Sequence, residues 1–312
     1  MKQHKGAHAF QSEHHTVVTI GTFDGVHIGH QKIIERLVNS ARAGNLESAI
    51  LTFFPHPRMV LQKDTDIKLI NTIRERKEIL EKCGVDHLII HPFTIQFSRL
   101  SAQEFVRDIL VNRLKAKKVI IGYDHRFGRN RTADINDLRR FGEQYDFEVE
   151  EISKQDVEEV AVSSTKIRKA LMEGKVEKAN RYLSYPFALA GKVVKGRGLG
   201  KEFEVPTANL QVEEEYKLIP ANGVYVVRSI IEDDVYFGMM SIGTNPTVGG
   251  TEKTIETHFF NLDKDLYGAY LSIEMLTRIR DEKKFDSVEG LKIAMKQDEA
   301  FSKQYIKDNY AQ

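Results

Sequence analysis

Two histidines in the stretch "GTFDGVHIGH", which runs from Gly21 to His30, have the spacing of a phosphate-handling pair. His27 and His30 are three residues apart, so both imidazoles can reach one group, and imidazoles donate hydrogen bonds to phosphoryl oxygens as charge develops. The start of a helix at this point would add backbone N–H groups that favour an anion. Three glycines allow close backbone approach and positive φ, namely Gly21, Gly25 and Gly29.

The same stretch has a plainer interpretation, as a glycine-rich turn with two incidental surface histidines. A metal site is not favoured, because no cluster of cysteines or carboxylates at ligand spacing accompanies the pair. The spacing alone leaves the phosphate site and the plain turn open.

Three further stretches could supply groups to the same site: "FFPHPRMVL" (53–61), "GYDHRFGRNR" (122–131) and "VSSTKIRKAL" (162–171). The last enters a helix with three hydroxyl residues and places cations in its first turn. Cations there oppose the helix dipole, which favours a bound anion. The alternative is a plain N-cap with a solvated basic face.

The elements around these stretches predict a parallel sheet covered by helices. Apolar runs recur at "TVVTIG", "SAILTFF", "DHLIIH" and "KKVIIGY", and they are continuous rather than alternating, which indicates burial on both faces. Helical spacing separates them, as in Ile33, Ile34, Leu37, Val38 and Ala41, and again in Ala102, Phe105, Val106, Ile109 and Leu110. In such α/β folds ligands bind beyond the carboxyl ends of the strands, where these loops fall.

The second half changes to short alternating segments that predict an antiparallel barrel. They are "FALAGKVV", "GVYVVRSII", "DVYFGMMSIG", "TIETHFFNL" and "YLSIEMLTRI", with turn signals between them. The polar segment 287–310 predicts a closing helix. We therefore expect two domains, residues 1–184 and 185–312, with the boundary marked by Pro186.

Composition narrows the function classes. A chain of 312 residues with formal net charge +1 and a pI near 7.8 has no bulk field to gather nucleic acid or an acidic membrane. The single cysteine, Cys83, excludes an internal disulfide, and no signal peptide or membrane-spanning run is present. We expect a soluble cytoplasmic protein. The N-terminal histidines, His4, His8, His14 and His15, favour a flexible tail over a metal site.

Together, "GTFDGVHIGH", "FFPHP", "GYDHRFG" and "SSTKIR" resemble the adenylyltransferase module of the bacterial bifunctional riboflavin kinase/FMN adenylyltransferases, also called FAD synthetases. That family carries the His-x-Gly-His signature of nucleotidyltransferases, here His27, Gly29 and His30. The resemblance implies a Rossmann-like nucleotidyltransferase domain that converts ATP and FMN to FAD and pyrophosphate with Mg²⁺.

The resemblance also implies roles for individual residues. His27, His30 and Arg168 would be catalytic, with Arg168 contacting the leaving pyrophosphate. Nucleotide contacts would come from Gly21, Phe23, Asp24, Gly29, Ser164, Thr165 and Asp124, of which Asp124 could instead face the flavin phosphate. The flavin would be lined by Pro55, His56, Pro57, Arg58, His125, Arg126 and Phe127.

The second half resembles the riboflavin kinase module of the same family, through "VPTANL", "NGVYVV", "SIGTNPTVGGTEKTIETHFF", "DLYG" and "IRDEKKFDS". The resemblance implies that Thr207 and Asn209 bind Mg²⁺ and nucleotide. It also implies that Glu256 is the base that takes a proton from the ribityl 5′-hydroxyl.

One loop of this module departs from the family pattern. Where relatives carry Gly-Arg-Thr-Leu-Gly-Phe-Pro-Thr-Ala-Asn, this chain reads "GKEFEVPTAN", and upstream Leu199 replaces an arginine. Glu202 and Glu204 would oppose ATP phosphates, at a cost on the order of several kcal/mol for one close like-charge pair. We therefore expect an FMN adenylyltransferase with a weak, silent or repurposed kinase domain. The alternatives are a fully bifunctional enzyme, or a barrel that senses flavin or binds a partner, RNA included.

Overall fold

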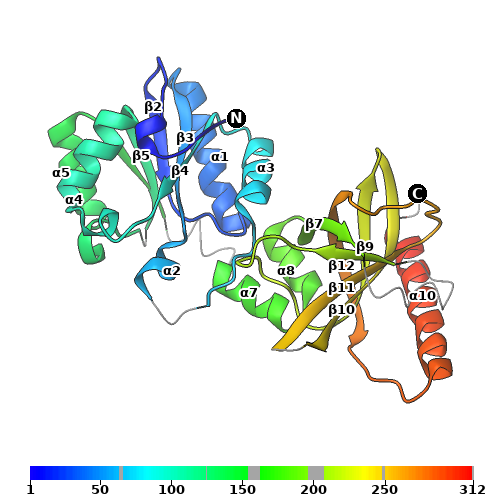
Figure 1. Cartoon of the computed structure of the whole chain (residues 1–312). Coiled ribbons are helices and arrows are strands. Elements are labelled where there is room, and N and C mark those ends of the chain that lie inside the picture. The colour runs from blue at the N-terminus through cyan, green and yellow to red at the C-terminus, as the bar shows by residue number, and fades with distance from the viewer. Residues whose placement is uncertain (63–65, 124, 154–161, 196–206, 248–249, 311–312) are drawn as a thin grey trace. The chain divides into compact units, whose positions relative to one another are not determined.

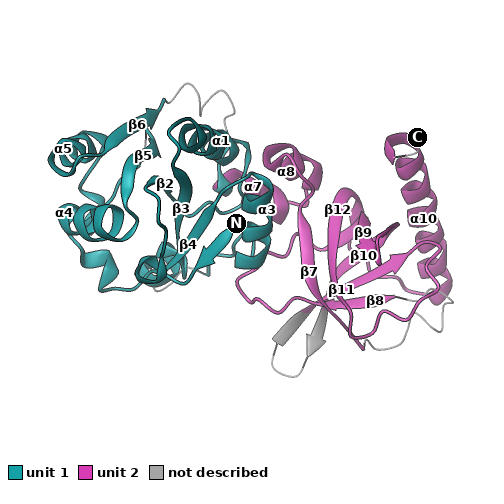
Figure 2. Ribbon diagram, turned by 90° about the horizontal axis from the view of Figure 1, so that it is seen from above, with its two compact units in different colours: residues 1–164 teal, residues 165–312 magenta. Residues whose placement is uncertain are grey.

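The chain divides into two compact units, Met1–Ser164 and Thr165–Gln312, which Figure 2 distinguishes by colour. The computed structural model describes residues 1–62, 66–123, 125–153, 162–195, 207–247 and 250–310. The division by compactness falls after Ser164, and the boundary that the sequence places after Ser184 stays a prediction.

The first unit is built on a six-stranded parallel sheet. Its strands are β1 (Lys2–His4), β2 (Thr16–Ile20), β3 (Glu47–Phe54), β4 (His87–Pro92), β5 (Ala116–Gly122) and β6 (Glu148–Ile152). Their order is β1-β4-β3-β2-β5-β6, and every pairing is parallel. The four predicted strands are confirmed as β2 to β5, and β1 and β6 extend the sheet at its two edges.

Helices cover both faces of this sheet (Figure 1). One face carries α1 (Ile28–Ala43) and α3 (Ile73–Lys82), whose Ile34, Leu37 and Leu80 are fully buried. The other face carries α4 (Ala102–Glu104), its continuation η3 (Phe105–Arg113) and α5 (Ile135–Tyr145). The apolar face predicted around Phe105 and Leu110 is buried as expected, but η3 is wound as a π-helix, with Leu114 N donating to Ile109 O at 2.9 Å.

Short elements complete the loops of this unit. They are η1 (Ala7–Ala9), α2 (Pro57–Leu61), η2 (Phe97–Arg99) and η4 (Arg129–Arg131).

The prediction of a flexible N-terminal tail is wrong. β1 pairs with β4, and Ala7 and Phe10 are buried in the sheet core. The His4 ring lies 3.0 Å from the His87 ring, N to N, and His87 Nε2 lies 2.9 Å from Glu47 Oε2. The segment that contains these histidines includes an edge strand. Burial of the apolar residues between the histidines fixes the segment on the sheet.

The second unit is a closed antiparallel barrel with helices α7 (Ser164–Met172) and α8 (Val176–Leu183) before it; Ser164 itself belongs to the first unit. The strands are β7 (Ala188–Val194), β8 (Ala208–Gln211), β9 (Gly223–Ile231), β10 (Asp234–Thr247), β11 (Gly250–Phe259) and β12 (Tyr270–Asp281). They close in the order β10-β11-β8-β7-β12-β9. The predicted barrel is confirmed, with β8 as the strand that alternation alone did not indicate.

The predicted closing helix is α10 (Val288–Tyr310). Asp298 of α10 is buried and accepts hydrogen bonds from the Arg280 guanidinium of β12 at 2.8–3.1 Å. This paired contact ties the helix to the barrel wall, since a bidentate arginine–carboxylate pair fixes geometry as well as charge.

Candidate active site

Three of the predicted loops begin at the carboxyl end of the parallel strands. β2 pairs with β3 on one side and β5 on the other, all parallel, so the segments after Ile20, Phe54 and Gly122 begin at the same end of the sheet. From β2 the chain adds β3 and β4 on one side of the sheet, and then β5 and β6 on the other side. Ligands of open α/β sheets bind where the order changes side in this way, here between β2 and β5. The fold therefore gathers three of the four stretches that the sequence singled out.

His27 and His30 form a stacked pair at the start of α1. Their ring centroids lie 3.7 Å apart with an interplanar angle of 16°. His27 is the N-cap, and its Nδ1 accepts a hydrogen bond from His30 N at 3.4 Å. The Phe23 ring contacts the His30 ring edge-on, with the ring centroids 5.1 Å apart.

Both imidazoles are held neutral. Burial lowers the pKa of His27 to about 4, against a smaller opposing effect of the Asp24 carboxylate. Burial, followed by the nearby His27 and the Arg76 guanidinium, lowers the pKa of His30 well below its ordinary value. His30 Nδ1 is buried and makes no hydrogen bond within the described part of the chain. A neutral ring has one N–H to donate, which suits stabilisation of phosphoryl oxygens.

Acidification is expected to destabilise the first unit through His27. Its folded pKa of about 4 lies below the ordinary 6.5, so the unfolded chain binds the extra proton between pH 6.5 and 4 and stability falls as pH falls. The full effect is about 3 kcal/mol. Hydrogen-exchange protection of the α1 amides at pH 7, 5.5 and 4.5 measures it. His27→Asn keeps a capping oxygen without this titration, so its protection is expected to change less; parallel losses in both proteins would contradict the assignment.

The loop that leads to these rings is strained. Gly25 has φ +88°, but the positive φ predicted for Gly21 and Gly29 is wrong: Phe23 (φ 47°) and Val26 (φ 36°) adopt it instead. Gly21 serves close approach, because a Cβ there would lie 3.0 Å from the Phe23 ring. A fully buried β-branched residue such as Val26 in this region costs about 1–3 kcal/mol, so the surrounding contacts must fix it.

Hydrogen bonds from three segments supply that restraint. Thr52 Oγ1 donates to Thr22 O at 3.2 Å, and Gln31 Nε2 donates to Val26 O at 2.8 Å. Ser164 Oγ donates to Asp24 O at 2.9 Å. The Asp24 carboxylate is itself fully buried.

Asp24, predicted as a nucleotide contact, is bound by protein groups. Its oxygens accept hydrogen bonds from Ile70 N at 3.0 and 3.1 Å and from Asn71 N at 3.2 Å, and the Arg76 guanidinium lies 3.6 Å away. Arg76 is not part of any motif that points to the site. A signal was present, because Arg76 lies four residues before buried Leu80 and so on the core-facing side of α3.

The predicted flavin-side residues divide between surface and core. Pro55, Arg58 and Arg126 are exposed, and Arg126 Nη1 lies 3.1 Å from Asp134. His56 is buried and caps α2, its Nδ1 accepting from Arg58 N at 3.1 Å. Phe127 is buried in the sheet core, and Asp124 lies outside the described residues.

Aromatic rings form a continuous series from the end of β3 to the loop after β5. Phe53 lies 5.5 Å from Phe97, Phe97 lies 6.1 Å from Phe105, and Phe105 lies 6.0 Å from Phe127. His125 stacks on Phe127 at 6.2 Å and 21°. Aromatic side chains therefore also lie at the carboxyl end of the sheet, where the histidine pair lies.

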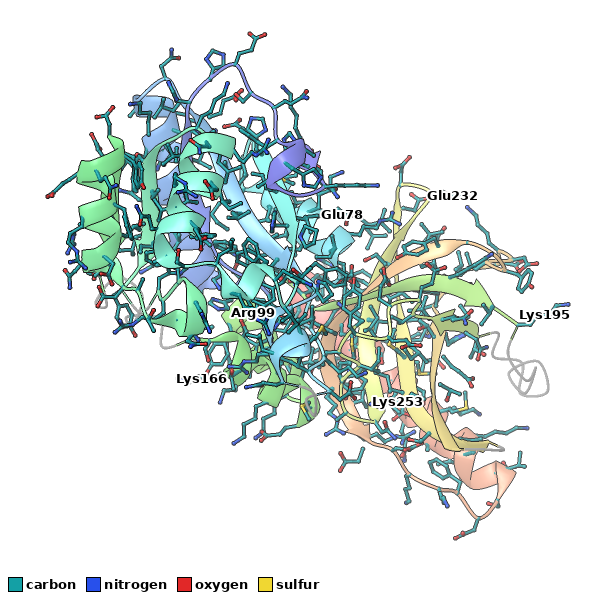
Figure 3. The ribbon with its side chains drawn as sticks, turned by 60° about the vertical axis from the view of Figure 1, so that its left-hand side comes forward. Glu78, Arg99, Lys166, Lys195, Glu232 and Lys253 are labelled. Carbon is teal, nitrogen blue, oxygen red and sulfur yellow. The ribbon has the colours of Figure 1, made fainter. Side chains whose placement is uncertain are left out.

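The predicted pyrophosphate-binding residues open α7. Ser164 ends the first unit, whereas Thr165 and Arg168 belong to the second. Thr165 is exposed, Arg168 is half-buried, and Lys166 lies on the exposed face of the helix (Figure 3). Their roles toward phosphate stay predictions.

The barrel brings together two of the residues expected to carry kinase chemistry. Glu256 of β11 lies directly opposite Asn209 of β8, as paired residues of the antiparallel ladder, and opposite Ser241 of β10 on its other side. Thr207 stands one residue before β8, and all three predicted residues are half-buried. Glu202 and Glu204, on which the doubt about the kinase rested, lie outside the described residues.

Two negative findings apply to the described part of the chain. It holds no group of three or more histidine, cysteine, aspartate or glutamate side chains arranged to bind a metal. Among the described helices, none is both long enough and apolar enough to cross a membrane.

Comparisons with known proteins match both units. The FAD synthetase family model matches residues 9–166, and the riboflavin kinase family model matches residues 183–306. The chain is 37% identical to the bifunctional riboflavin kinase/FMN adenylyltransferase of Listeria monocytogenes, covering 91% of this chain and 90% of that one. It is 34% identical to the protein of the same name from Escherichia coli K12, over 93% of this chain and 92% of that one.

A solved structure has the same fold along its length. It is titled a macrolide-efflux protein from Streptococcus pneumoniae, and it matches with a TM-score of 0.88 and 33% identity, over 97% of this chain and 98% of that chain. The family models and the curated relatives confirm the resemblance drawn from the motifs over most of the chain.

Proposed function

This chain belongs to the family of bifunctional riboflavin kinase/FMN adenylyltransferases, and we propose that it carries out both reactions: phosphorylation of riboflavin to FMN by the barrel, and transfer of AMP from ATP to FMN by the first unit. The observation that carries the adenylyl-transfer half of the proposal is the stacked pair of neutral imidazoles, His27 and His30, at the start of α1.

The adenylyl transfer needs positioning more than proton transfer. A phosphate oxygen of FMN attacks the α-phosphorus of ATP, the bond from that phosphorus to the bridging oxygen of the β-phosphate breaks, and pyrophosphate leaves with the electron pair. The FMN phosphate is already ionised at neutral pH, so no general base is required. The imidazole N–H groups of His27 and His30 stabilise the charge that develops on the phosphoryl oxygens.

The remaining contacts in this reaction are proposed from the family motifs and the chemistry of the side chains. Ser164, Thr165 and Arg168 bind the β- and γ-phosphates, with the planar guanidinium of Arg168 making several contacts to pyrophosphate. The flavin ring packs at the aromatic edge, near Phe53 and His125, because flat apolar rings favour stacked or edge-on aromatic partners.

The kinase reaction does require a base, since its nucleophile is a neutral alcohol. Glu256 takes the proton of the ribityl 5′-hydroxyl as the hydroxyl oxygen attacks the γ-phosphorus of ATP, and ADP leaves. Its ladder partner Asn209 supports this role by lying next to it across the β8–β11 pair.

Mg²⁺ fits the donor set at this barrel site. The Thr207 hydroxyl and the Asn209 amide oxygen are hard oxygen ligands, and Mg²⁺ commonly binds through a few protein oxygens together with substrate phosphates and waters. When bound, the ion neutralises phosphate charge.

The expectation of a silent kinase is not supported. The riboflavin kinase family model covers the barrel, and the matched curated relatives are named as bifunctional. Charge in one loop therefore gives no sufficient reason to remove the activity.

The test is to incubate the purified chain with Mg²⁺ and ATP, with riboflavin in one tube and FMN in another, under oxidising and reducing conditions, and to separate the flavins by chromatography. We expect FMN and FAD from riboflavin, and FAD from FMN with one pyrophosphate for each FAD. Unchanged riboflavin would overturn the kinase half of the proposal, and unchanged FMN the adenylyltransferase half.

A further inference from the structure

Arg76 is a fully buried cation in the first turn of α3. It is 1% exposed, its Nη2 lies 3.6 Å from Asp24 Oδ1, and its Nη1 donates to Thr52 Oγ1 at 3.4 Å. Burying a guanidinium and a carboxylate together is weak evidence for stability, because apolar residues of similar volume often serve as well. Such a pair calls for a reason other than the free energy of folding.

The segment that carries Arg76 is rigid and faces one carboxylate. Thr72 and Glu75 form a capping box, with Glu75 N donating to Thr72 Oγ1 at 3.1 Å and Thr72 N donating to Glu75 Oε2 at 2.9 Å. Just before this cap, Ile70 N and Asn71 N donate to Asp24. Two amides and a guanidinium thus converge on a single side chain.

That side chain lies in the strained turn that ends in the histidine pair. Asp24 stands between Phe23 and Val26, the two residues with left-handed φ, and three residues before His27. Thr52 links the same guanidinium to the turn a second time, because its hydroxyl donates to Thr22 O. The Arg76 side chain therefore contacts the Asp24 side chain directly and is linked through the Thr52 hydroxyl to the backbone carbonyl of Thr22.

We propose that Arg76 is a positioning residue for adenylyl transfer, holding Asp24 and the turn from Thr22 to Val26 so that His27 and His30 stand ready at the phosphates. This inference rests on the proposed function of the first unit. Asp24 then acts inside the protein as the anchor of the turn, in place of the nucleotide contact expected from the sequence.

A double-mutant cycle on the full chain tests this inference, using Arg76→Met, Asp24→Asn and the double variant. Each single variant is expected to lower kcat for FAD formation about 100-fold, since small misplacements of reacting groups have effects of this size. The KM for ATP should change much less. The double variant should be no slower than the slower single one, because both remove the same anchor. Multiplying losses, or a loss confined to the KM for ATP, would overturn the proposal.

Arg76→Lys is the matched control for charge. It should recover at least tenfold of the loss seen in Arg76→Met, and riboflavin phosphorylation by the barrel should be unchanged in every variant. If Arg76→Met does not fold, Thr52→Val decides, because it removes the second link while leaving the ion pair; a kcat equal to that of the unmodified chain would then overturn the proposal.

Ring NMR signals of the histidines separate this inference from the proposed function. In the ligand-free protein, Arg76→Met should shift or broaden the signals of His27 and His30 and leave that of exposed His14 unchanged. Unchanged signals for the pair would overturn the positioning role even if the unmodified chain forms FAD. An unmodified chain that forms no FAD would overturn the proposed function and, with it, a role of Arg76 in that reaction.

Discussion

Replacing His30 with alanine is expected to lower the rate of FAD formation from FMN about 100- to 1,000-fold, the effect of removing one preorganised donor from a transition state of developing charge. His30 has the geometry for such a role, with its ring stacked on His27 at 3.7 Å and held edge-on by Phe23. The loss should appear in kcat, because the donor matters most when charge accumulates on the phosphoryl oxygens. Steady-state FAD formation at saturating ATP and FMN measures it.

The barrel supplies an internal control for this variant. Phosphorylation of riboflavin by His30→Ala should equal that of the unmodified chain, because the proposed kinase residues Thr207, Asn209 and Glu256 all belong to the second unit. His14→Ala, at an exposed histidine, should leave both reactions unchanged. FAD formation by His30→Ala at the unmodified rate would contradict the role assigned to His30.

The sequence predicted the sheet, the barrel and the position of the histidine pair because each depends on local pattern. Continuous β-branched runs indicated β2 to β5, and alternation indicated most of the barrel. Because β2, β3 and β5 are parallel neighbours, the loops that follow them begin at the same end of the sheet. This arrangement depends on the topology and not on any particular side chain.

Contacts between residues distant in sequence could not be predicted from local pattern. The placement of Asp24 depends on Arg76 and on two amides, all 46 or more residues away, so its motif position suggested a ligand contact and not a buried anchor. The histidines of the N-terminal segment predict a flexible tail, whereas burial of Ala7 and Phe10 and the pairing of β1 with β4 fix the segment on the sheet. The left-handed φ angles of Phe23 and Val26 could not be predicted from local pattern either, because this backbone region is typical of glycine.

Replacing Glu256 with glutamine is expected to lower riboflavin phosphorylation about 100- to 10,000-fold, the usual contribution of a general base. Glutamine has nearly the same shape and keeps a polar contact toward Asn209 across the β8–β11 ladder, but it cannot take the proton of the ribityl hydroxyl. The loss should fall on kcat, with the KM for ATP little changed. Formation of FMN from riboflavin and ATP, followed by chromatography, measures it.

Glu256→Gln is expected to lose the reaction that His30→Ala keeps, and to keep the reaction that His30→Ala loses. Supplied with FMN, Glu256→Gln should form FAD at the unmodified rate; supplied with riboflavin, it should accumulate neither FMN nor FAD. Mixing the two variants should restore FAD formation from riboflavin, because FMN released by His30→Ala can diffuse to the intact adenylyltransferase unit of Glu256→Gln. Undiminished phosphorylation by Glu256→Gln would remove Glu256 from the kinase reaction. Failure of the mixture, with each single reaction intact, would instead require that FMN passes between the units of one chain without release.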